Sequence, residues 1–357
     1  MNLYYGDKMK LFIYADPHWS SYSSIVRSRG EKYSTRLENL IKTMNWIESE
    51  AMAKGCDAIV CLGDFFDRSE LTSEEITALQ EVMWSDIPHW FIVGNHEMGR
   101  SNLEHSSSHL FQLLPNASVI DDINIYNTVD TTLVSIPYIL ESNRKPLKEY
   151  LDGLQLKENV IILSHNDIAG IQMGQFLSTT GFSVDEIKDS CKLFINGHLH
   201  NGTEIGNIIN LGNITGQNFS EDAFRYSHNA LILDTEEKSV QKVTNPYAMN
   251  FYKLNLTNLT KENDSTTILL NLNDVKYPAV VTVTATHENV SYIKNIIEES
   301  DSIIESRCII EGSISTPTEE FSNEEHTVDH ITKFQQFVLE HIGTSDLIQN
   351  ELERVSK

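Results

Sequence analysis

Cysteine, glycine, proline and long apolar runs, which are typical of several broad classes of protein, are scarce in this sequence. Its four cysteines among 357 residues show neither the density of a disulfide scaffold nor a Cys-x-x-Cys pair. Only 17 glycines and 8 prolines occur, which excludes collagen-like and low-complexity chains. No apolar run approaches the roughly 20 residues of a membrane helix, and residues 1–10 lack the hydrophobic stretch of a secretory signal. We therefore expect a globular cytoplasmic protein with no membrane association.

Positive charge is also scarce. Lysine and arginine total 27 against 51 aspartate and glutamate residues, which gives a formal net charge of −24. Such a surface on average repels nucleic acid, so a polyanionic substrate needs a local source of attraction. The one basic run near the first motif described below contains Arg27, Arg29, Lys32 and Arg36. Phosphate binding and a solvated helix face explain this run equally well.

What the sequence does have is an alternation of short apolar runs with longer segments of helical period, which is typical of an α/β fold. Strands are predicted at residues 11–15, 58–62, 90–93, 132–136, 160–163, 193–195, 208–211 and 230–233. Helical spacing predicts one helix that ends near Gly55 and another over residues 73–85. A separate small unit follows, with a strand at 279–284, a helix near 288–298 and a strand at 303–310.

The last part of the chain changes character. Acidic and polar residues dominate 312–327 and predict a linker. Beyond it, apolar residues at spacings of three and four predict a short amphipathic helix, with a stripe formed by Val328, Ile331, Phe334, Val338 and Ile342. A helix packed on its own protein and a helix that binds a partner are both open, and the preceding linker favours a partner.

Polar clusters follow five of the predicted strands. They are Asp16-Pro17-His18, Gly63-Asp64-Phe65-Phe66-Asp67, Gly94-Asn95-His96-Glu97, Ser164-His165-Asn166 and Gly197-His198-Leu199-His200. Ligands of open α/β folds bind at the carboxyl ends of the strands, so we expect these clusters to meet at one rim. Seven of the side chains are good metal ligands: Asp16, His18, Asp64, Asn95, His165, His198 and His200.

Each cluster alone has a simpler explanation. Asp-x-His could equally be a capped turn, an aspartate after glycine is more often a helix N-cap, and a single histidine is more often structural. These explanations must hold five times independently, whereas one dinuclear metal site accounts for all the clusters. Oxygen and nitrogen ligands without thiolate suit manganese, iron, zinc or cobalt. Two such ions about 3.5 to 4 Å apart would support phosphoester hydrolysis.

The order Asp-x-His, Gly-Asp-x-x-Asp, Gly-Asn-His-Glu, His and Gly-His-x-His resembles that of the calcineurin-like metallophosphoesterases. The resemblance implies a four-layer α/β fold in which two central sheets are flanked by helices. It implies one ion held by Asp16, His18, Asp64 and His200, and a second held by Asp64, Asn95, His165 and His198. It also implies that His96 faces the scissile phosphate, as transition-state stabiliser or proton donor, and that Glu97 orients His96.

Within that family, the layout of the whole chain resembles the SbcD-type nuclease subunits of double-strand-break processing complexes, including those of T-even-like phages. The early strand before Asp-x-His, the small later unit and the terminal stripe carry this resemblance. It implies a nuclease domain over 1–245, a DNA-binding capping domain over 246–311, an acidic linker over 312–327 and a partner-binding helical segment over 328–357. The anchors of that segment would be Ile331, Phe334, Phe337 and Val338.

The same resemblance implies an activity and a partner. The activity would be manganese-dependent cleavage of DNA, as a double-strand exonuclease and a single-strand endonuclease, in recombination or repair. The partner would be an SMC-like ATPase of the SbcC type, in a heterotetramer that contains a homodimer of this chain. ATP hydrolysis would belong to the partner, because the sequence has no Gly-x-x-x-x-Gly-Lys-Ser/Thr phosphate loop.

Two alternatives stay open. The segments Gly63 to Arg68 and Gly94 to Glu97 also resemble the protein serine/threonine phosphatases. Those enzymes usually have Gly after Asp-x-His and Arg before Gly-Asn-His, where this chain has Trp19 and Val93. The other alternative is a non-catalytic scaffold with a decayed metal site, which would bind less than one equivalent of metal.

Overall fold

The computed structural model describes residues 8–21, 31–156, 159–173, 176–219, 221–257, 275–276 and 278–310. Two six-stranded sheets form its centre. Three short two-stranded ribbons accompany them: β4 (Met98–Gly99) with β5 (Asn102–Ser106), β10 (Ile168–Ala169) with β13 (Phe182–Ser183), and β11 (Gln172–Met173) with β12 (Phe176–Leu177).

The first sheet has the strand order β18-β17-β1-β2-β3-β6. Its strands are β1 (Lys10–Tyr14), β2 (Ala58–Cys61), β3 (His89–Ile92), β6 (Ala117–Ile120), β17 (Asn229–Asp234) and β18 (Ser239–Thr244). Strands β1, β2, β3 and β6 are parallel, and β17 pairs antiparallel with β1. The carboxyl ends of the parallel strands therefore lie along one edge of this sheet.

The second sheet has the strand order β15-β16-β14-β9-β8-β7. Its strands are β7 (Asn124–Asn127), β8 (Thr131–Ile136), β9 (Asn159–Ser164), β14 (Leu193–Asn196), β15 (Thr203–Ile205) and β16 (Ile208–Asn210). The four central strands are parallel, with antiparallel strands at both edges. Buried β-branched and leucine residues fill the central strands, as in sheets that are covered on both faces.

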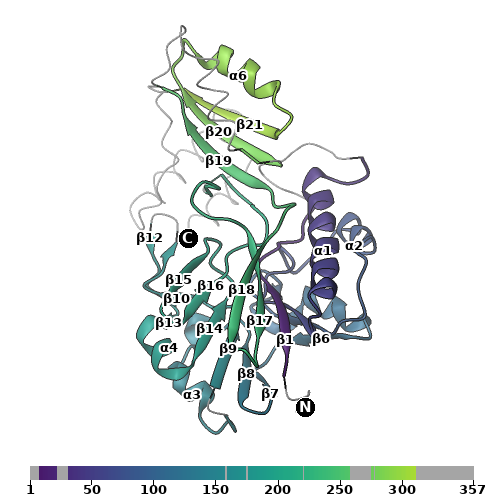
Figure 1. Cartoon of the computed structure of the whole chain (residues 1–357), viewed down its shortest axis with the longest axis vertical. Coiled ribbons are helices and arrows are strands. Elements are labelled where there is room, and N and C mark those ends of the chain that lie inside the picture. Colours follow the sequence, from purple (N-terminus) through teal and green to yellow (C-terminus); the bar gives the residue numbers. More distant parts are fainter. Residues whose placement is uncertain are drawn as a thin grey trace, which may run out of the picture. The chain divides into compact units, whose positions relative to one another are not determined.

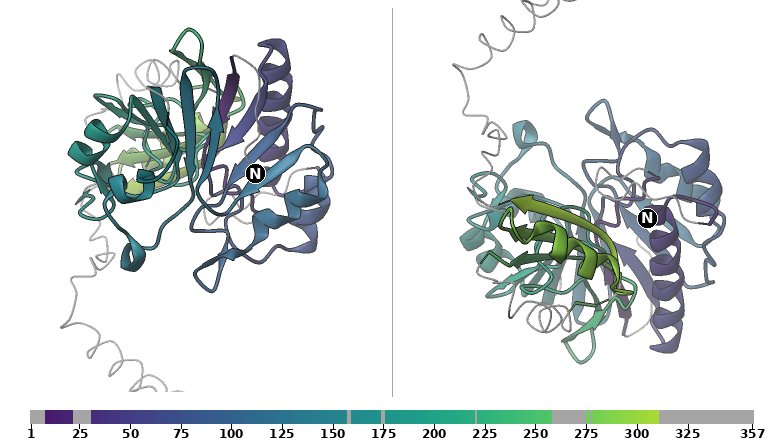
Figure 2. Two further views of the ribbon diagram at one scale, coloured as in Figure 1. Left: turned by 90° about the horizontal axis from the view of Figure 1, so that it is seen from below. Right: turned by 90° about the horizontal axis from the view of Figure 1, so that it is seen from above.

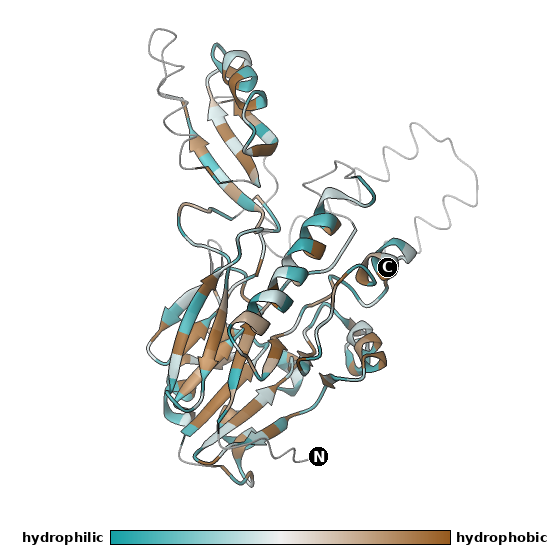
Figure 3. Cartoon of the chain, turned by 45° about the vertical axis from the view of Figure 1, so that its right-hand side comes forward, coloured by the Kyte–Doolittle hydropathy of each residue, from teal (hydrophilic) through white to brown (hydrophobic). Residues whose placement is uncertain are grey.

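The layers follow from the alternation of side chains along each strand. In β1, Leu11 and Ile13 lie in a core between the two sheets, together with Leu133 and Ile161 of the second sheet. The intervening Phe12 and other outward residues pack beneath a helix layer on the far side. A third core covers the other face of the second sheet. Figures 1 and 2 show helices on the two outer sides, and Figure 3 shows the predominantly hydrophobic strands between them.

The first helix layer consists of α1 (Thr35–Ala53) and α2 (Ser73–Leu79). Helix α1 begins at the N-cap Ser34, whose side chain accepts a hydrogen bond from the Leu37 amide, and buries residues at helical spacing. Helix α2 begins with a capping box between Thr72 and Glu75. On the second sheet, α3 (Leu147–Leu151) and α4 (Val184–Ser190) supply the other layer.

Helix α2 is shorter than the predicted helix over residues 73–85. The predicted C-terminal end was wrong. The Met83 amide donates to Asn45 Oδ1 at 2.8 Å, and the Ser85 amide donates to Glu48 Oε2 at 3.1 Å. Side chains of α1 thus satisfy backbone groups that a longer helix would have paired internally. These side-chain acceptors compete with the helical hydrogen bonds only after the chain has folded, so helical periodicity in the sequence does not reveal them.

A three-stranded parallel sheet follows, with the order β19-β20-β21. It contains β19 (Asn250–Asn255), β20 (Ala279–Ala285) and β21 (Ile303–Ile310), and α6 (Val290–Glu298) connects the last two. Tyr252 and Val281 pack with α6 on one face, and Phe251 and Val280 pack near Phe219 on the other. Strands β20 and β21 and helix α6 match the predicted small unit, whereas β19 was not predicted.

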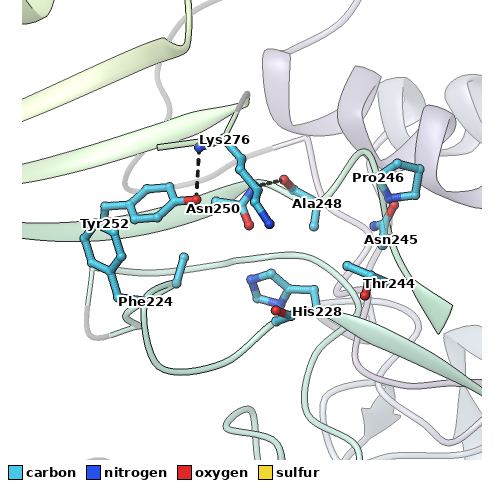
Figure 4. Close-up of a pocket in the computed structure, with 11 residues that line it drawn as sticks. Phe224, His228, Thr244, Asn245, Pro246, Ala248, Asn250, Tyr252 and Lys276 are labelled. Atoms are coloured by element: carbon cyan, nitrogen blue, oxygen red, sulfur yellow. Dashed lines mark hydrogen bonds between the residues drawn. The ribbon is translucent and has the colours of Figure 1, made fainter. Parts of the chain in front are cut away.

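Residues Met1–Ile310 form one compact unit, so the domain boundary at 245 and 246 stays a prediction. Where β18 leads into β19, a pocket of about 490 Å3 is lined by Phe224, His228, Asn245, Asn250 and Tyr252, among others (Figure 4). None of the seven predicted metal ligands lines it. The acidic linker and the helical segment lie outside the described residues. No described helix combines the length and apolar character needed to cross a bilayer.

All eight strands predicted in the α/β region are present, with ends shifted by at most one residue. The predicted four-layer fold, with helices flanking two central sheets, is confirmed. Strands β6, β7, β15 and β18 of the two central sheets were missed. Polar or charged residues interrupt their apolar pattern, since β7 reads Asn-Ile-Tyr-Asn and β18 is exposed at every position except Val240 and Val243.

Candidate metal centre

Five strand ends carry the predicted ligands. Asp16 follows β1, Asp64 follows β2, Asn95 follows β3, His165 follows β9 and His198 follows β14. Backbone amides join the loops: the Asp16 amide donates to the Gly63 carbonyl at 3.2 Å, and the His198 amide donates to the Asp16 carboxylate at 3.0 Å. Both sheets therefore deliver their motifs to one rim.

The loops that hold the ligands are conformationally strained. Asp16, His18, Asp64 and His198 have positive φ angles of 52°, 47°, 48° and 73°. Non-glycine residues rarely adopt this left-handed conformation, and such strain persists only where surrounding structure imposes it. Only seven non-glycine residues of the described chain have positive φ, so the concentration on four predicted ligands points to a functional site.

Two glycines of the motifs are required by close approach. Gly63 has a φ of 101°, and a Cβ atom there would overlap with Nδ1 of His165. A Cβ atom at Gly94 would overlap with Oδ1 of Asp64. A larger residue at either position would push a predicted ligand out of place.

One group of ligand atoms comes from Asp16, His18 and His200, which lie within 4.8 Å of one another. The Nε2 atoms of His18 and His200 face each other at 3.1 Å. Burial lowers the pKa of His18, and burial together with His18 lowers the pKa of His200 to about 3. Two imidazoles whose Nε2 atoms meet beside a carboxylate, both with lowered pKa values, suit a cation.

A second group consists of Asp64, His165 and His198, also within 4.8 Å. His165 Nδ1 lies 2.6 Å from the Leu62 carbonyl oxygen and therefore donates to it. Its Nε2 then faces Asp64 Oδ2 at 3.0 Å and Asn95 Oδ1 at 3.3 Å. Burial lowers the pKa of His165, but the charge of Asp64 and other carboxylates raises it to about 9. Either a proton or a cation must hold these oxygen atoms and Nε2 together.

The Asp64 carboxylate lies between the two groups. Its Oδ2 is 3.0 Å from His165 Nε2 in one group and 3.8 Å from His18 Nε2 in the other. Its Oδ1 accepts a hydrogen bond from the His96 amide at 2.9 Å. Burial raises the pKa of Asp64, but the nearby histidines lower that pKa by more, so the side chain is a carboxylate. Asp64 thus has the position expected for a shared ligand.

His96 lies beside these groups with an exposed side chain. Its ring meets that of His18 edge to face, with centroids 4.5 Å apart. Its Nδ1 is 3.0 Å from the Asp67 carbonyl oxygen, so that oxygen holds the ring in place. This arrangement leaves Nε2 of His96 for a molecule that enters from solvent.

The predicted role of Glu97 as the orienter of His96 does not agree with its contacts. The Glu97 carboxylate is buried and accepts hydrogen bonds from the amides of Gly94, Asp64 and Phe65 and from the Ser108 hydroxyl. It therefore ties the Asp64 loop to the Gly94 loop. The physical reason is that the carboxylate turns inward, to backbone amides that would otherwise be unpaired. Asp67 contacts His96 instead.

Sequence reasoning missed two acidic residues at the centre. Asp67 Oδ1 lies 3.1 Å from His18 Nδ1, and Asp167 Oδ1 lies 3.0 Å from His198 Nε2. Burial raises the pKa of each carboxyl, but the hydrogen-bonded histidine lowers it by more. Asp67 closes the Gly-Asp-x-x-Asp motif, which was a usable signal. Asp167 lies two residues after His165 in no motif, and nothing in the sequence singled it out.

The described residues of the basic run, Lys32 and Arg36, both have partners within the protein. Arg36 is buried and donates to the carbonyl oxygens of Gly216 and Pro17 at 2.7 and 2.8 Å. Lys32 is exposed and forms an ion pair with Glu81. Arg27 and Arg29 lie outside the described residues, as do the predicted partner anchors Ile331, Phe334, Phe337 and Val338.

The chain belongs to the calcineurin-like phosphoesterase family, whose model matches residues 9–202, more than half of its length. This membership indicates metal-dependent phosphoesterase activity and divalent metal binding. The matched segment spans all seven predicted ligands. No curated protein sequence matches the chain.

Several solved structures resemble the chain at low identity. TT1561 of Thermus thermophilus is 9% identical, with 66% of this chain and 99% of that one covered and a TM-score of 0.41. A dimetal phosphatase from Danio rerio is 15% identical, with 66% and 99% covered and a TM-score of 0.38. YfcE, a phosphoesterase from E. coli, is 12% identical, with 66% and 100% covered and a TM-score of 0.33. Likenesses at these TM-scores support no inference about function.

Proposed function

We propose that the chain is a dinuclear-metal DNA nuclease, active as a double-strand exonuclease and a single-strand endonuclease. The observation that carries the proposal is the Asp64 carboxylate, which lies between two sets of imidazole and carboxylate ligands. In one set, Asp16 and His18 follow β1 of the first sheet, and His200 lies beyond β14 of the second sheet. In the other set, His165 and His198 follow β9 and β14 of the second sheet. An arrangement of this kind suits two cations that act on one phosphate.

We assign Asp16, His18, Asp64 and His200 to one ion, and Asp64, Asn95, His165 and His198 to the other. The donors fit this use, because His198 Nδ1 is buried without a hydrogen-bond partner in the described residues and neither group of candidate ligands contains a cysteine. The chemistry that bound divalent ions, which we propose to be Mn2+, supply here is Lewis-acid activation of phosphate and water. The strained loops preset the ligands for that purpose.

His96 is the proposed catalytic residue. Its Nδ1 donates to the Asp67 carbonyl oxygen, and the Asp67 carboxylate lies 3.9 Å from the same nitrogen. A protonated ring held this way carries its second proton on Nε2, where it can pass to the leaving oxygen of a phosphodiester. Glu97 supports the reaction only through the Asp64 and Gly94 loops.

Sequence and structure favour a nuclease over a phosphoprotein phosphatase. Trp19 and Val93 stand where the phosphatase pattern has Gly and Arg. Arg68, the cation of the phosphatase-like motif, donates to Glu75 Oε1 at 2.8 Å and to the Glu70 carbonyl oxygen at 2.9 Å. Its guanidinium is therefore engaged by neighbouring acceptors and not free for a phosphopeptide.

The net charge of −24 predicts that the chain alone binds DNA weakly at physiological salt. We propose that the metal ions and an SMC-like ATPase of the SbcC type supply the attraction, in a heterotetramer for recombination or repair. The three-stranded sheet would cap the DNA, and the segment 328–357 would bind the ATPase through Ile331, Phe334, Phe337 and Val338.

The decisive experiment offers a labelled DNA duplex and a phosphopeptide in parallel, each with Mn2+ or with a chelator. We expect Mn2+-dependent cleavage of DNA, lost in His96→Ala by about 100-fold or more although that variant still binds Mn2+. His105→Ala, an exposed histidine on β5 outside the ligand groups, is the matched control and should cleave normally. Phosphate release from the peptide with intact DNA would refute the nuclease, and substoichiometric Mn2+ would favour the scaffold.

A truncation tests the partner. Deleting the residues after Thr327 should leave Mn2+-dependent hydrolysis of a small phosphodiester unchanged and abolish copurification with the SMC-like ATPase. If the truncated chain still binds the ATPase, the terminal stripe is not the binding segment.

A further inference from the structure

The two nitrogens of His198 have very different surroundings. Nε2 lies 3.0 Å from Oδ1 of Asp167, whereas Nδ1 is buried and has no hydrogen-bond partner among the described residues. A carboxylate only accepts hydrogen bonds, so Nε2 carries the proton of the neutral ring. Nδ1 then keeps its lone pair, in the residue that groups with Asp64 and His165.

Asp167 is itself held in place from several sides. Its carbonyl oxygen accepts the Phe182 amide at 3.1 Å, and a Cβ atom at Gly181 would overlap with that same carbonyl group. On the side-chain side, Nη2 of Arg144 lies 3.9 Å from Oδ2 of Asp167. The carboxylate therefore has little freedom to leave Nε2 of His198.

Arg144 is fixed in turn. Its side chain is 6% exposed, and its guanidinium lies 4.9 Å from the centroid of the Phe182 ring. It donates to the Ile139 carbonyl at 2.7 Å and to Asn166 Oδ1 at 3.1 Å. A buried arginine with this many partners forms a rigid support behind Asp167.

We infer that Asp167, supported by Arg144, is a positioning residue that fixes the tautomer of His198 and so presents Nδ1 as a metal ligand. The inference rests on the metal site of the proposed function and deepens it. Partners behind ligating histidines raise their basicity and fix the ring, and loss of such a partner typically costs 10- to 100-fold in metal affinity. Asp167 contributes without contacting substrate.

A second histidine and aspartate pair provides a matched control. His109 Nε2 lies 3.0 Å from Asp121 Oδ2, the same separation as in the Asp167 pair. His109 belongs to no group of candidate metal ligands in the described chain. Removing Asp121 therefore removes an equivalent hydrogen bond without touching the tautomer of a ligand.

The experiment is a titration of the full-length chain with Mn2+ alone, followed by electron paramagnetic resonance of the free ion. Wild-type protein should bind two ions. Asp167→Ala should weaken one of them by about 10- to 100-fold and leave the other unchanged. Asp167→Glu should restore part of the affinity, because a longer carboxylate can still accept from Nε2. Asp121→Ala should match the wild type.

A spectroscopic measurement separates positioning from simple structural support. With 15N-labelled histidine, metal-free wild-type protein should show His198 protonated at Nε2, and Asp167→Asn should shift this ring toward the Nδ1-protonated form. An Asn can donate to Nε2, which would place the proton on the nitrogen that must bind metal. Unchanged tautomer populations, or equal weakening of both ions, would overturn the inference.

The outcomes remain distinct from those of the nuclease assay. If the wild type binds two Mn2+ but leaves DNA intact, the proposed substrate is wrong and the role of Asp167 still stands on the titration. If Asp167→Ala binds both ions as tightly as the wild type, the inference fails whatever the substrate. A wild type that binds no Mn2+ would overturn both.

Discussion

Two buried histidines, His89 and His165, have similar exposure and opposite surroundings. His89 Nε2 meets Glu48 Oε1 at 2.8 Å, and the other Glu48 oxygen accepts from the Ser85 hydroxyl at 2.7 Å. His89 Nδ1 lies 3.4 Å from Nδ2 of Asn116, so each polar side-chain atom of His89 and Glu48 has a partner. His89 lies in the regular strand β3. His165 instead directs Nε2 at two acceptor oxygens, from Asp64 and Asn95.

The difference shows how a ligand histidine is told from a core histidine. Around His89, donors and acceptors balance. At the metal centre, lone pairs exceed donors: His18 and His200 point nitrogens at each other, and His198 Nδ1 has no partner in the described residues. Such an excess is costly in a buried site unless a cation takes it up. Left-handed backbone at four predicted ligands adds a further cost that His89 does not carry.

Among the proposed substitutions, Asp64→Asn should impair the metal centre most severely. The substitution weakens a ligand that both ions share, so we expect the Mn2+ content to fall from two ions toward none. Hydrolysis of a small phosphodiester should fall by more than about 100-fold, because about 100-fold is the upper range for loss of a residue that only supports a ligand. Elemental analysis and the initial rate check both. Two retained ions in this variant would contradict the shared-ligand assignment.

His89→Ala and His165→Ala test the comparison directly. His89→Ala leaves Oε1 of the buried Glu48 without its histidine partner, although Oε2 keeps Ser85, and should cost about 2 to 4 kcal/mol of unfolding free energy. It should still gain stability on addition of Mn2+, about 2.7 kcal/mol per site at 100 times the dissociation constant. His165→Ala should gain clearly less, because a ligand is missing. Urea unfolding with and without Mn2+ measures both, and an equal gain in the two variants would make His165 a core histidine.

The limits of sequence prediction follow from the same physics. Strand-end motifs such as Asp64 and His198 were predictable, because buried parallel strands are visible as apolar runs and their ends converge. The partners behind the ligands were not, since Asp167 and Arg144 meet through the fold and share no motif. The direction of the Glu97 side chain was also hidden, because it depends on which backbone amides remain unpaired after the loops pack.

Glu97→Gln separates the predicted role of Glu97 from the observed one. Each of its oxygens accepts two hydrogen bonds, so an amide NH2 in either orientation faces backbone donors. We expect a loss of about 1 to 3 kcal/mol in stability and weaker Mn2+ binding, because the Asp64 loop loosens. A residue that only orients His96 would leave Mn2+ affinity unchanged. The Mn2+ titration therefore decides between them.

The smallest effect concerns a third buried histidine, His228, whose Nδ1 donates to the Asn213 carbonyl and whose Nε2 lies 3.9 Å from Glu221 Oε2. Burial raises the pKa of Glu221 to about 7 and lowers that of His228 to about 4. The folded state therefore holds a proton on Glu221 that the unfolded chain releases near pH 4.5, so this contribution to stability falls as pH rises to 7. His228 acts with the opposite sign, but only between pH 4 and about 6.5.

Above pH 6.5, Glu221 is the only member of this pair whose contribution to stability still changes with pH. Wild-type stability should fall from pH 6.5 to 8 by on the order of 1 kcal/mol more than that of Glu221→Gln, whose amide does not titrate. The amide oxygen can keep the bonds from Asn213 and Gln217, which the carboxylate accepts through Oε1. Urea unfolding of metal-free protein at both pH values measures the difference. Parallel pH profiles of stability for the two proteins would show that Glu221 is already ionised at pH 6.5. His228 would then resemble the metal-centre histidines, because its ring would lie beside a buried charge without a counter-charge.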